Sequence, residues 1–112
     1  MTGLKFTDNN RKGDFWEKWV GLNAWMRGSE VFKNDGCTGP SDMVIQIGKD
    51  YIPVDVKSMF WDKAVGYYRS YASCRIADGV WQVSVNPQTA EIDWPKVNGK
   101  YTCPAGLEEY WK

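Results

Sequence analysis

The sequence predicts one α/β domain over residues 1–112, built from a helix, three antiparallel strands, a second helix and further strands. Apolar residues recur at helical spacing between Phe15 and Met26. They alternate with polar residues at 43–47 and 52–56, and again at 80–85 after an Asp-Gly pair. A chain of 112 residues has room for one core and little room for a separate recognition domain.

The composition excludes several classes of enzyme. The chain contains no histidine, which excludes histidine metal sites, Ser-His and Cys-His triads and histidine acid–base chemistry. Carboxylate, lysine, tyrosine and cysteine chemistry remains. The formal net charge is zero, which argues against a strongly basic coat for nucleic acid but allows a local basic face.

The cysteines and the N-terminus indicate a reducing compartment. Cys37, Cys74 and Cys103 are widely spaced and form no Cys-x-x-Cys pair, so they predict neither a disulfide framework nor a zinc knuckle. The N-terminus does not resemble a signal peptide, and no apolar run approaches the length of a membrane span. We therefore expect a cytoplasmic protein without a membrane partner, in the host cytosol if it is encoded by a phage.

A first helix is predicted over residues 14–27, with Gly28 as its C-terminal cap. Its expected buried stripe consists of Phe15, Trp19, Leu22 and Met26. Glu17 lies beside this stripe in the first turn and has two interpretations. Asp14-x-x-Glu17 matches a capping box, in which the glutamate bonds back to the helix start. Alternatively, Glu17 contributes an acid to a functional site.

The two alternating runs at 43–47 and 52–56 predict a β-hairpin, preceded by a short strand at 30–32 and a turn at 33–36. A loop at Lys49-Asp50, or a four-residue loop at 48–51, places all six apolar residues on one face. The predicted pairs are Ile47 with Ile52, Ile45 with Val54 and Met43 with Val56.

The same register decides which polar side chains share the opposite face. It pairs Asp42 with Lys57 and Val44 with Asp55. Asp42 is then diagonal to Asp55, at about 7–8 Å between backbones, near enough for two carboxylates to converge on one ion. An odd loop length would break both the apolar and the polar match.

A second helix is predicted over residues 62–75, although Gly66 weakens this prediction. The segment from residue 57 to residue 75 has one acid, Asp62, and four bases: Lys57, Lys63, Arg69 and Arg75. Its tyrosines either form a core stripe or place one ring on an exposed base. In the second case Lys63, Arg69 and Arg75 contact phosphates.

The remaining chain predicts strands at 80–85 and 90–94, separated by a turn at 86–89. The tail, residues 95–112, mixes turn residues with Leu107, Tyr110 and Trp111. We expect its aromatic end to dock on the body of the domain or on a partner subunit.

Asp42, Asp55 and Lys57 together resemble the active site of the PD-(D/E)xK phosphodiesterase superfamily, which includes many restriction enzymes and Holliday-junction resolvases. The lead-in Gly39-Pro40-Ser41-Asp42 is most similar to that of small archaeal and phage resolvase-like nucleases. Ser41 stands where the name of the signature puts proline. The predicted element order also agrees with a restriction-endonuclease-like core, in which a helix, a three-stranded antiparallel meander, a helix and further strands form a mixed sheet.

This resemblance implies magnesium-dependent hydrolysis of DNA, with manganese as a substitute metal. Asp42, Asp55 and the backbone carbonyl of Val56 would hold one or two ions, and Glu17 would add a ligand. Lys57 would position or help deprotonate the attacking water. Ser41, next to Asp42, joins the basic residues of 62–75 as an expected contact to nucleic acid.

Three functions remain open at this point. The favoured one is a structure-selective endonuclease for branched DNA such as a Holliday junction, acting as a homodimer so that two sites meet two strands. The second is a homing-type or other endonuclease that cuts duplex DNA. The third is a catalytically inactive DNA-binding or assembly module, which should not bind magnesium or manganese appreciably.

Overall fold

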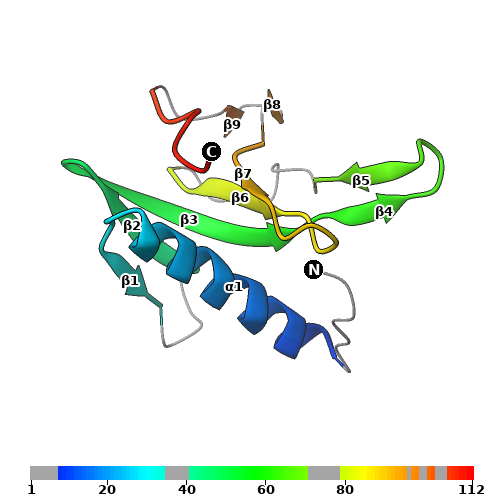
Figure 1. Cartoon of the computed structure of the whole chain (residues 1–112), viewed down its shortest axis with the longest axis horizontal. Helices are drawn as coiled ribbons and strands as arrows, with labels where there is room; N and C mark the ends of the chain where they lie inside the picture. Colours follow the sequence, from blue (N-terminus) through cyan, green and yellow to red (C-terminus); the bar gives the residue numbers. More distant parts are fainter. Residues whose placement is uncertain (1–7, 35–40, 71–78, 96, 99–100, 103–105) are drawn as a thin grey trace.

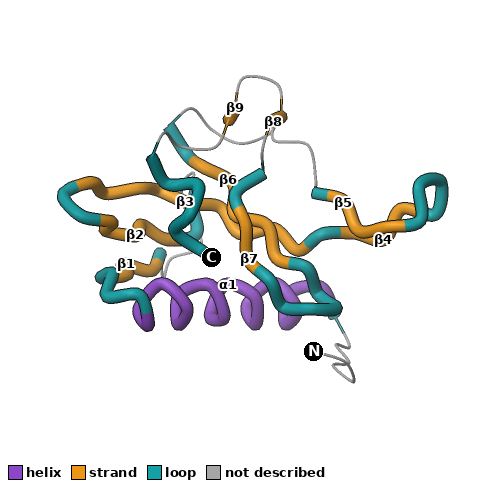
Figure 2. Tube along the Cα trace, turned by 45° about the horizontal axis from the view of Figure 1, so that its top comes forward, coloured by secondary structure: helices purple, strands orange, loops and turns teal. Residues whose placement is uncertain are grey.

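The computed structural model describes residues 8–34, 41–70, 79–95, 97–98, 101–102 and 106–112. One helix, α1 (Asn9–Met26), lies across one face of a five-stranded sheet with the order β1-β2-β3-β6-β7 (Figures 1 and 2). The strands of this sheet are β1 (Val31–Lys33), β2 (Met43–Ile47), β3 (Asp50–Ser58), β6 (Trp81–Val85) and β7 (Ile92–Asp93). Two smaller sheets pair β4 (Phe60–Asp62) with β5 (Tyr67–Arg69), and β8 (Val97–Asn98) with β9 (Tyr101–Thr102).

The strand directions confirm the predicted α/β class. β1, β2 and β3 form an antiparallel meander, β6 pairs in parallel with β3, and β7 pairs antiparallel with β6. The sheet is therefore mixed, as expected. The strands at 30–32 and 90–94 were also expected, and they occur with shifted or shorter bounds, as β1 and β7. The described residues contain no helix that is both long enough and apolar enough to cross a membrane.

The second helix is a wrong prediction for residues 62–70, which form most of the β4–β5 hairpin instead. Gly66 adopts φ +77° in the four-residue loop, and its amide donates to the carbonyl of Asp62 at 2.8 Å. The Asp62 carboxylate accepts from the amide of Ala64 at 2.9 Å. The flanking aromatic residues favour strands. Arg75 and the three cysteines lie outside the described residues.

α1 begins earlier than predicted, because Asp8 is its N-cap and accepts a hydrogen bond from the amide of Arg11 at 2.7 Å. Asp14 consequently lies inside the helix, and the capping-box interpretation of Glu17 is wrong. At the other end Gly28 has φ +87°, as expected for a C-terminal cap.

The buried face of α1 also differs from the predicted stripe. Trp16, Val20 and Ala24 are buried in the core, whereas Leu22 and Met26 are 55% and 76% exposed. The other two predicted residues, Phe15 and Trp19, are partly buried at the margin of the core. Apolar residues surround most of this helix, so their spacing alone does not select one face; packing against the sheet selects it.

The hairpin keeps the predicted faces but has a register shifted by two residues. The observed pairs are Met43 with Val54, Ile45 with Ile52 and Ile47 with Asp50. The loop is therefore Gly48-Lys49, with Gly48 at φ +63°, a conformation that suits the first loop position of a type II′ turn. One step further along this register, Asp42 stands opposite Asp55. The predicted opposition of Asp42 and Lys57 is thus wrong, and the two aspartates are closer than the predicted diagonal.

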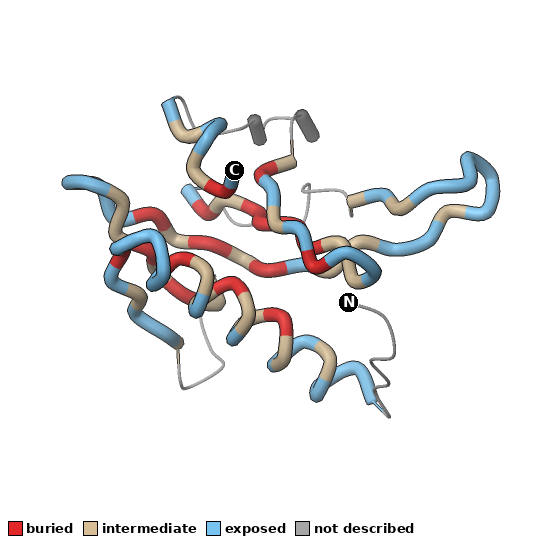
Figure 3. The backbone as a smooth tube through the Cα atoms, in the orientation of Figure 1, coloured by how far each residue is buried: buried red, intermediate tan, exposed pale blue. Residues whose placement is uncertain are grey.

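The core lies between α1 and one face of the sheet, and the C-terminal residues complete it (Figure 3). Trp111 is only 6% exposed, and its ring centroid lies 5.7 Å from that of Trp94. Tyr110 reaches the helix end through its hydroxyl, 2.6 Å from the Ser29 hydroxyl. The expected docking of the aromatic tail on the body of the domain is confirmed.

Candidate active site

Asp42 lies immediately before β2, an interior strand of the sheet. Its amide donates to the carbonyl of Val54 at 2.9 Å, and its carbonyl accepts from the amide of Asn34 at 3.1 Å. The paired part of β2 ends at Met43, so the amide of Val56 on β3 extends beyond the ladder. The Asp42 carboxylate accepts from this amide at 2.7 Å. These contacts fix the position of the carboxylate before any ligand arrives.

The carbonyl of Val56 lies on the same side of β3 as its amide, because both groups of one strand residue point to the same side. Since the amide donates to Asp42, the carbonyl is directed towards the side of β3 on which β2 and Asp42 lie. This geometry places a hard oxygen ligand near the aspartate, as the sequence resemblance implies.

Two further carboxyl groups meet Asp42. Glu17 on α1 and Asp55 on β3 each lie within hydrogen-bonding reach of the Asp42 carboxyl group. Two ionised carboxylates are both acceptors, so each of these contacts requires a proton. Burial, followed by contact with Asp42, raises the pKa of Glu17 to about 7 and the pKa of Asp55 to about 7.

Two lysines flank this carboxylate cluster, which we define as Glu17, Asp42 and Asp55. The Lys57 ammonium lies 3.6 Å from Oδ2 of Asp55 and lowers the pKa of that group, which nevertheless stays high. Lys33 on β1 likewise lowers the pKa of Glu17, which also stays high. The Lys57 side chain is 48% exposed, so it reaches the solvent in which a phosphate would approach.

The chemistry of the cluster fits magnesium. Among the described residues no group of three or more acidic or cysteine side chains is arranged so that it could hold a metal ion by itself. Magnesium does not need three such side chains, because it keeps several waters and is usually bound by one or two carboxylates together with substrate phosphates. Asp42, Asp55 and the Val56 carbonyl would provide hard oxygens where β2 begins next to β3, and a cation there would replace the protons that the cluster otherwise shares.

Sequence reasoning missed two polar residues near the cluster. Asn34 holds the segment before β2, because its side-chain amide donates to the Ser41 carbonyl at 3.0 Å. Gln82 on β6 stands beside Asp55 in the parallel register and is only 4% exposed. The alternation of Gln82 and Ser84 with valines was visible in the sequence, but only the pairing of β3 with β6 places them beside Asp55.

The expected nucleic-acid contacts occupy two places. Ser41 is partly buried next to Asp42, whereas Lys63 is exposed in the loop of the β4–β5 hairpin. Arg69, on the same hairpin, forms an ion pair with Asp62 at 3.0 Å. The structure therefore brings Glu17, Asp42, Asp55 and Lys57 together and carries Lys63 and Arg69 on a separate projection.

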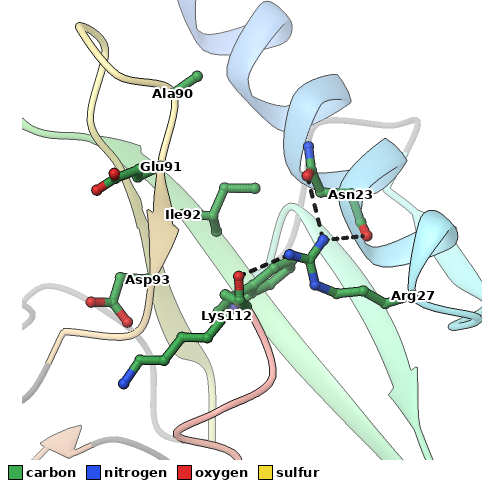
Figure 4. Close-up of a pocket in the computed structure, with 8 residues that line it drawn as sticks. Asn23, Arg27, Ala90, Glu91, Ile92, Asp93 and Lys112 are labelled. Carbon is green, nitrogen blue, oxygen red and sulfur yellow. Dashed lines mark hydrogen bonds between the residues drawn. The ribbon is translucent and has the colours of Figure 1, made fainter.

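A pocket of about 410 Å³ lies elsewhere, between α1, β7 and the C-terminal residues (Figure 4). Arg27 crosses it and donates to the carbonyls of Tyr110 and Trp111 at 2.9 and 2.8 Å. The carboxylate cluster contributes nothing to its lining. We therefore interpret this pocket as part of the contact between the C-terminal tail and the rest of the domain.

Comparison with known proteins supports the fold. No protein-family model and no curated protein sequence matches the chain. Among solved structures the chain is similar to a bacterial homing endonuclease, I-Ssp6803I, with a TM-score of 0.69. The match covers 95% of this chain and 90% of that chain at 19% sequence identity. The protein thus has a fold similar to that of a homing endonuclease, in agreement with the nuclease-type fold that the sequence resemblance implies.

Proposed function

We propose that the protein is a metal-dependent endonuclease that hydrolyses phosphodiester bonds in duplex DNA. The observation that carries this proposal is the meeting of Glu17, Asp42 and Asp55 beside Lys57, where β2 begins next to β3. Partly buried acids with raised pKa values and a neighbouring cation are typical of functional sites. The fold similarity to a homing endonuclease supports the same conclusion.

Each residue of the cluster has a defined role in this proposal. Mg²⁺ or Mn²⁺ would be held by Asp42, Asp55 and the Val56 carbonyl. Glu17 would contact Asp42 from α1 and so stabilise the site from the side of the helix. The bound metal supplies Lewis-acid polarisation of the scissile phosphate and a lower pKa for the attacking water. Lys57 orients that water and offsets negative charge as it develops on the phosphate.

Duplex DNA is the substrate that the comparison favours. The sequence favoured branched DNA, with duplex cutting as an alternative, and the similar structure is named as a homing endonuclease. We therefore adopt the alternative. Cleavage of both strands also requires two sites of opposite direction, so we propose that the protein acts as a homodimer, in which two-fold symmetry supplies them.

The test is cleavage of a randomised duplex library and of a four-way junction by the parent protein and by Asp55→Ala, with magnesium, with manganese and with EDTA. We expect metal-dependent cleavage that Asp55→Ala reduces by about 10³-fold or more. Trp25→Ala is the matched control, because this side chain is 66% exposed on α1 and lies outside the cluster.

Undiminished cleavage by a clean Asp55→Ala preparation would refute the proposal. If the parent cleaves the junction much faster than matched linear duplex, branched DNA is the preferred substrate. Equal rates remove the junction preference.

A further inference from the structure

The β4–β5 hairpin, which we call the ribbon, projects from the end of the sheet away from the helix-covered core (Figures 1 and 3). Its register places Phe60 and Tyr67 on one face and Trp61 on the other. These three side chains are 36%, 57% and 52% exposed, respectively. A hairpin that served the core would bury one face, whereas the ribbon leaves aromatic residues exposed on both.

The ribbon is ordered by its own contacts. The rings of Trp61 and Tyr68 meet edge to face, with centroids 5.3 Å apart. On the opposite face Asp62 pairs with Arg69 at 3.0 Å and also accepts from the turn amide of Ala64. Two-stranded hairpins are marginal in water, so these contacts preform a shape that would otherwise require a partner.

Both ends of the ribbon are fixed to β6. The amide of Met59, just before β4, donates to the carbonyl of Val85 at 2.8 Å. The hydroxyl of Ser84, which is only 3% exposed, donates to that of Ser70, just after β5, at 2.9 Å. Because β4 also continues the chain from β3, the ribbon has a defined orientation relative to Asp55.

The charge of the segment favours an anionic partner. Residues 57–70 contain three bases, Lys57, Lys63 and Arg69, and one acid, Asp62, in a chain whose formal net charge is zero. Arg69 and Asp62 compensate each other in the ion pair, which leaves Lys63, among the described residues, as the uncompensated base of the ribbon, with Lys57 near the start of the ribbon. The exposed Lys63 at the tip, together with Lys57, gives this end of the molecule a positive charge that favours a polyanion as the partner.

We infer that the ribbon inserts into the major groove of duplex DNA and reads base edges to one side of the cut, an inference that rests on the proposed endonuclease function. The major groove of B-DNA is about 12 Å wide and admits a two-stranded ribbon. Lys63 at the tip contacts a phosphate or a guanine edge, and Tyr67 contacts the base edges beside it.

The length of the ribbon sets the extent of the sequence that it reads. Lys63 follows Asp55 by eight positions, which corresponds to at most about 26 Å of extended chain. At about 3.4 Å per base pair this distance spans about eight base pairs. Base preference should therefore extend from the cut to roughly eight base pairs on the side of the ribbon.

Selection of bound sequences from a library of randomised 30-bp duplexes tests the inference. The selecting protein carries Asp55→Ala, so that binding is measured without cleavage. Lys63→Glu and Tyr67→Ala are then added singly, with Lys18→Glu and Trp25→Ala on the exposed side of α1 as matched controls.

We expect each ribbon variant to weaken duplex binding at least 10-fold and to lose base preference within the eight-base-pair window, while each control changes affinity less than 2-fold. Methylation of guanine N7 in that window should block binding, because this atom lies in the major groove. Thermal unfolding should be unchanged in all four variants, since the side chains are exposed.

Unchanged affinity and preference in both ribbon variants would overturn the inference, even if metal-dependent cleavage by the parent upholds the endonuclease. Interference confined to adenine N3 would overturn it in favour of the minor groove. A changed sedimentation coefficient for Tyr67→Ala with full duplex affinity would assign the ribbon to contact between copies. Conversely, loss of selection in the ribbon variants of a parent that never cleaves would retain groove binding and reject the endonuclease.

Discussion

Two polar regions of this molecule show opposite kinds of electrostatics. Around Arg27, each nitrogen of the guanidinium group meets an acceptor: the carbonyls of Tyr110, Trp111 and Asn23 lie at 2.9, 2.8 and 3.0 Å. The guanidinium carbon also lies 5.5 Å from the ring centroid of Trp111. The charged group of Arg27 is therefore compensated by these acceptors, and its hydrogen bonds hold the C-terminal tail against α1.

The carboxylate cluster is not satisfied in the same way. Glu17 and Asp55 both approach Asp42, and their raised pKa values show that the ionised forms are disfavoured there. A cluster of like charges lowers the stability of the fold. Such clusters are found at functional sites, where a bound ligand relieves the repulsion. The difference separates a polar cluster that holds the fold from one that is prepared for a cation.

The largest expected effect separates activity from stability at Asp42. Asp42→Asn should reduce metal-dependent cleavage by about 10³-fold, because it removes a ligand charge. It should maintain or raise the melting temperature of the metal-free protein, since the amide oxygen can still accept from Val56 and one repulsive charge is lost. If Asp42→Asn loses cleavage only because its melting temperature falls strongly, Asp42 stabilises the fold as Arg27 does, and the two regions do not differ in role.

The opposite behaviour is expected at Trp111. Trp111→Ala should cost about 3–5 kcal/mol of unfolding free energy, because the indole is buried against Trp94 and Arg27. Cleavage per folded molecule should not change. Denaturant unfolding and an active-fraction assay at low temperature measure the two quantities. A specific loss of turnover in the folded fraction would connect the tail to catalysis.

A smaller effect is expected at Asn34, which positions Asp42 without contacting the reacting atoms. Asn34→Ala removes the 3.0 Å bond to the Ser41 carbonyl and should lower cleavage about 10-fold while raising the metal concentration for half-maximal rate. Asn23→Ala is the control, since it removes a 2.9 Å side-chain bond to the Trp19 carbonyl away from the cluster. Equal cleavage by both variants would show that Asn34 has only a structural role.

The smallest effect concerns pH. Folding raises the pKa of Glu17 and of Asp55 to about 7, so between pH 4 and 7 the folded state binds more protons than the unfolded state. Stability from these groups is therefore lost as pH rises through this window. The metal-free protein should melt at a higher temperature at pH 6 than at pH 8, and the chain has no histidine to obscure the trend.

The control for this pH dependence is Asp42→Asn, which removes the charge that faces both groups. Its melting temperature should depend less on pH over the same window. An equal slope in the variant and the parent would mean that Asp42 does not contribute to the raised pKa values and that burial causes them without it.

Much of the fold followed from the sequence, and the reasons are local. An even loop length fixes which face each strand residue occupies, so the apolar face of the hairpin and the shared face of Asp55 and Lys57 were predictable. The register was not, because a two-residue shift preserves both faces. The turn decides it: Gly48 adopts a positive φ at the first loop position, which leaves Asp50 to pair with Ile47.

The errors arose where local patterns are ambiguous. The apolar residues of α1 between Phe15 and Met26 lie on several sides of the helix, so spacing did not choose between Trp16 and Leu22 as core residues. Ala64, Tyr67 and Tyr68 occur near helical spacing, yet Gly66 and the Asp62 turn close a hairpin there. The contacts of Asn34 and Gln82 depend on segments that meet only in the folded chain, and no local signal indicates them.

The most direct test of the carboxylate cluster is isothermal titration of the DNA-free protein with Mg²⁺ and Mn²⁺ at pH 7, in two buffers of different ionisation enthalpy. A cation that replaces shared protons must release them, so the parent should bind metal with net proton release. Asp42→Asn should bind far more weakly and release fewer protons. A parent that binds neither metal, or an Asp42→Asn variant that binds as the parent does, would contradict the proposed metal site.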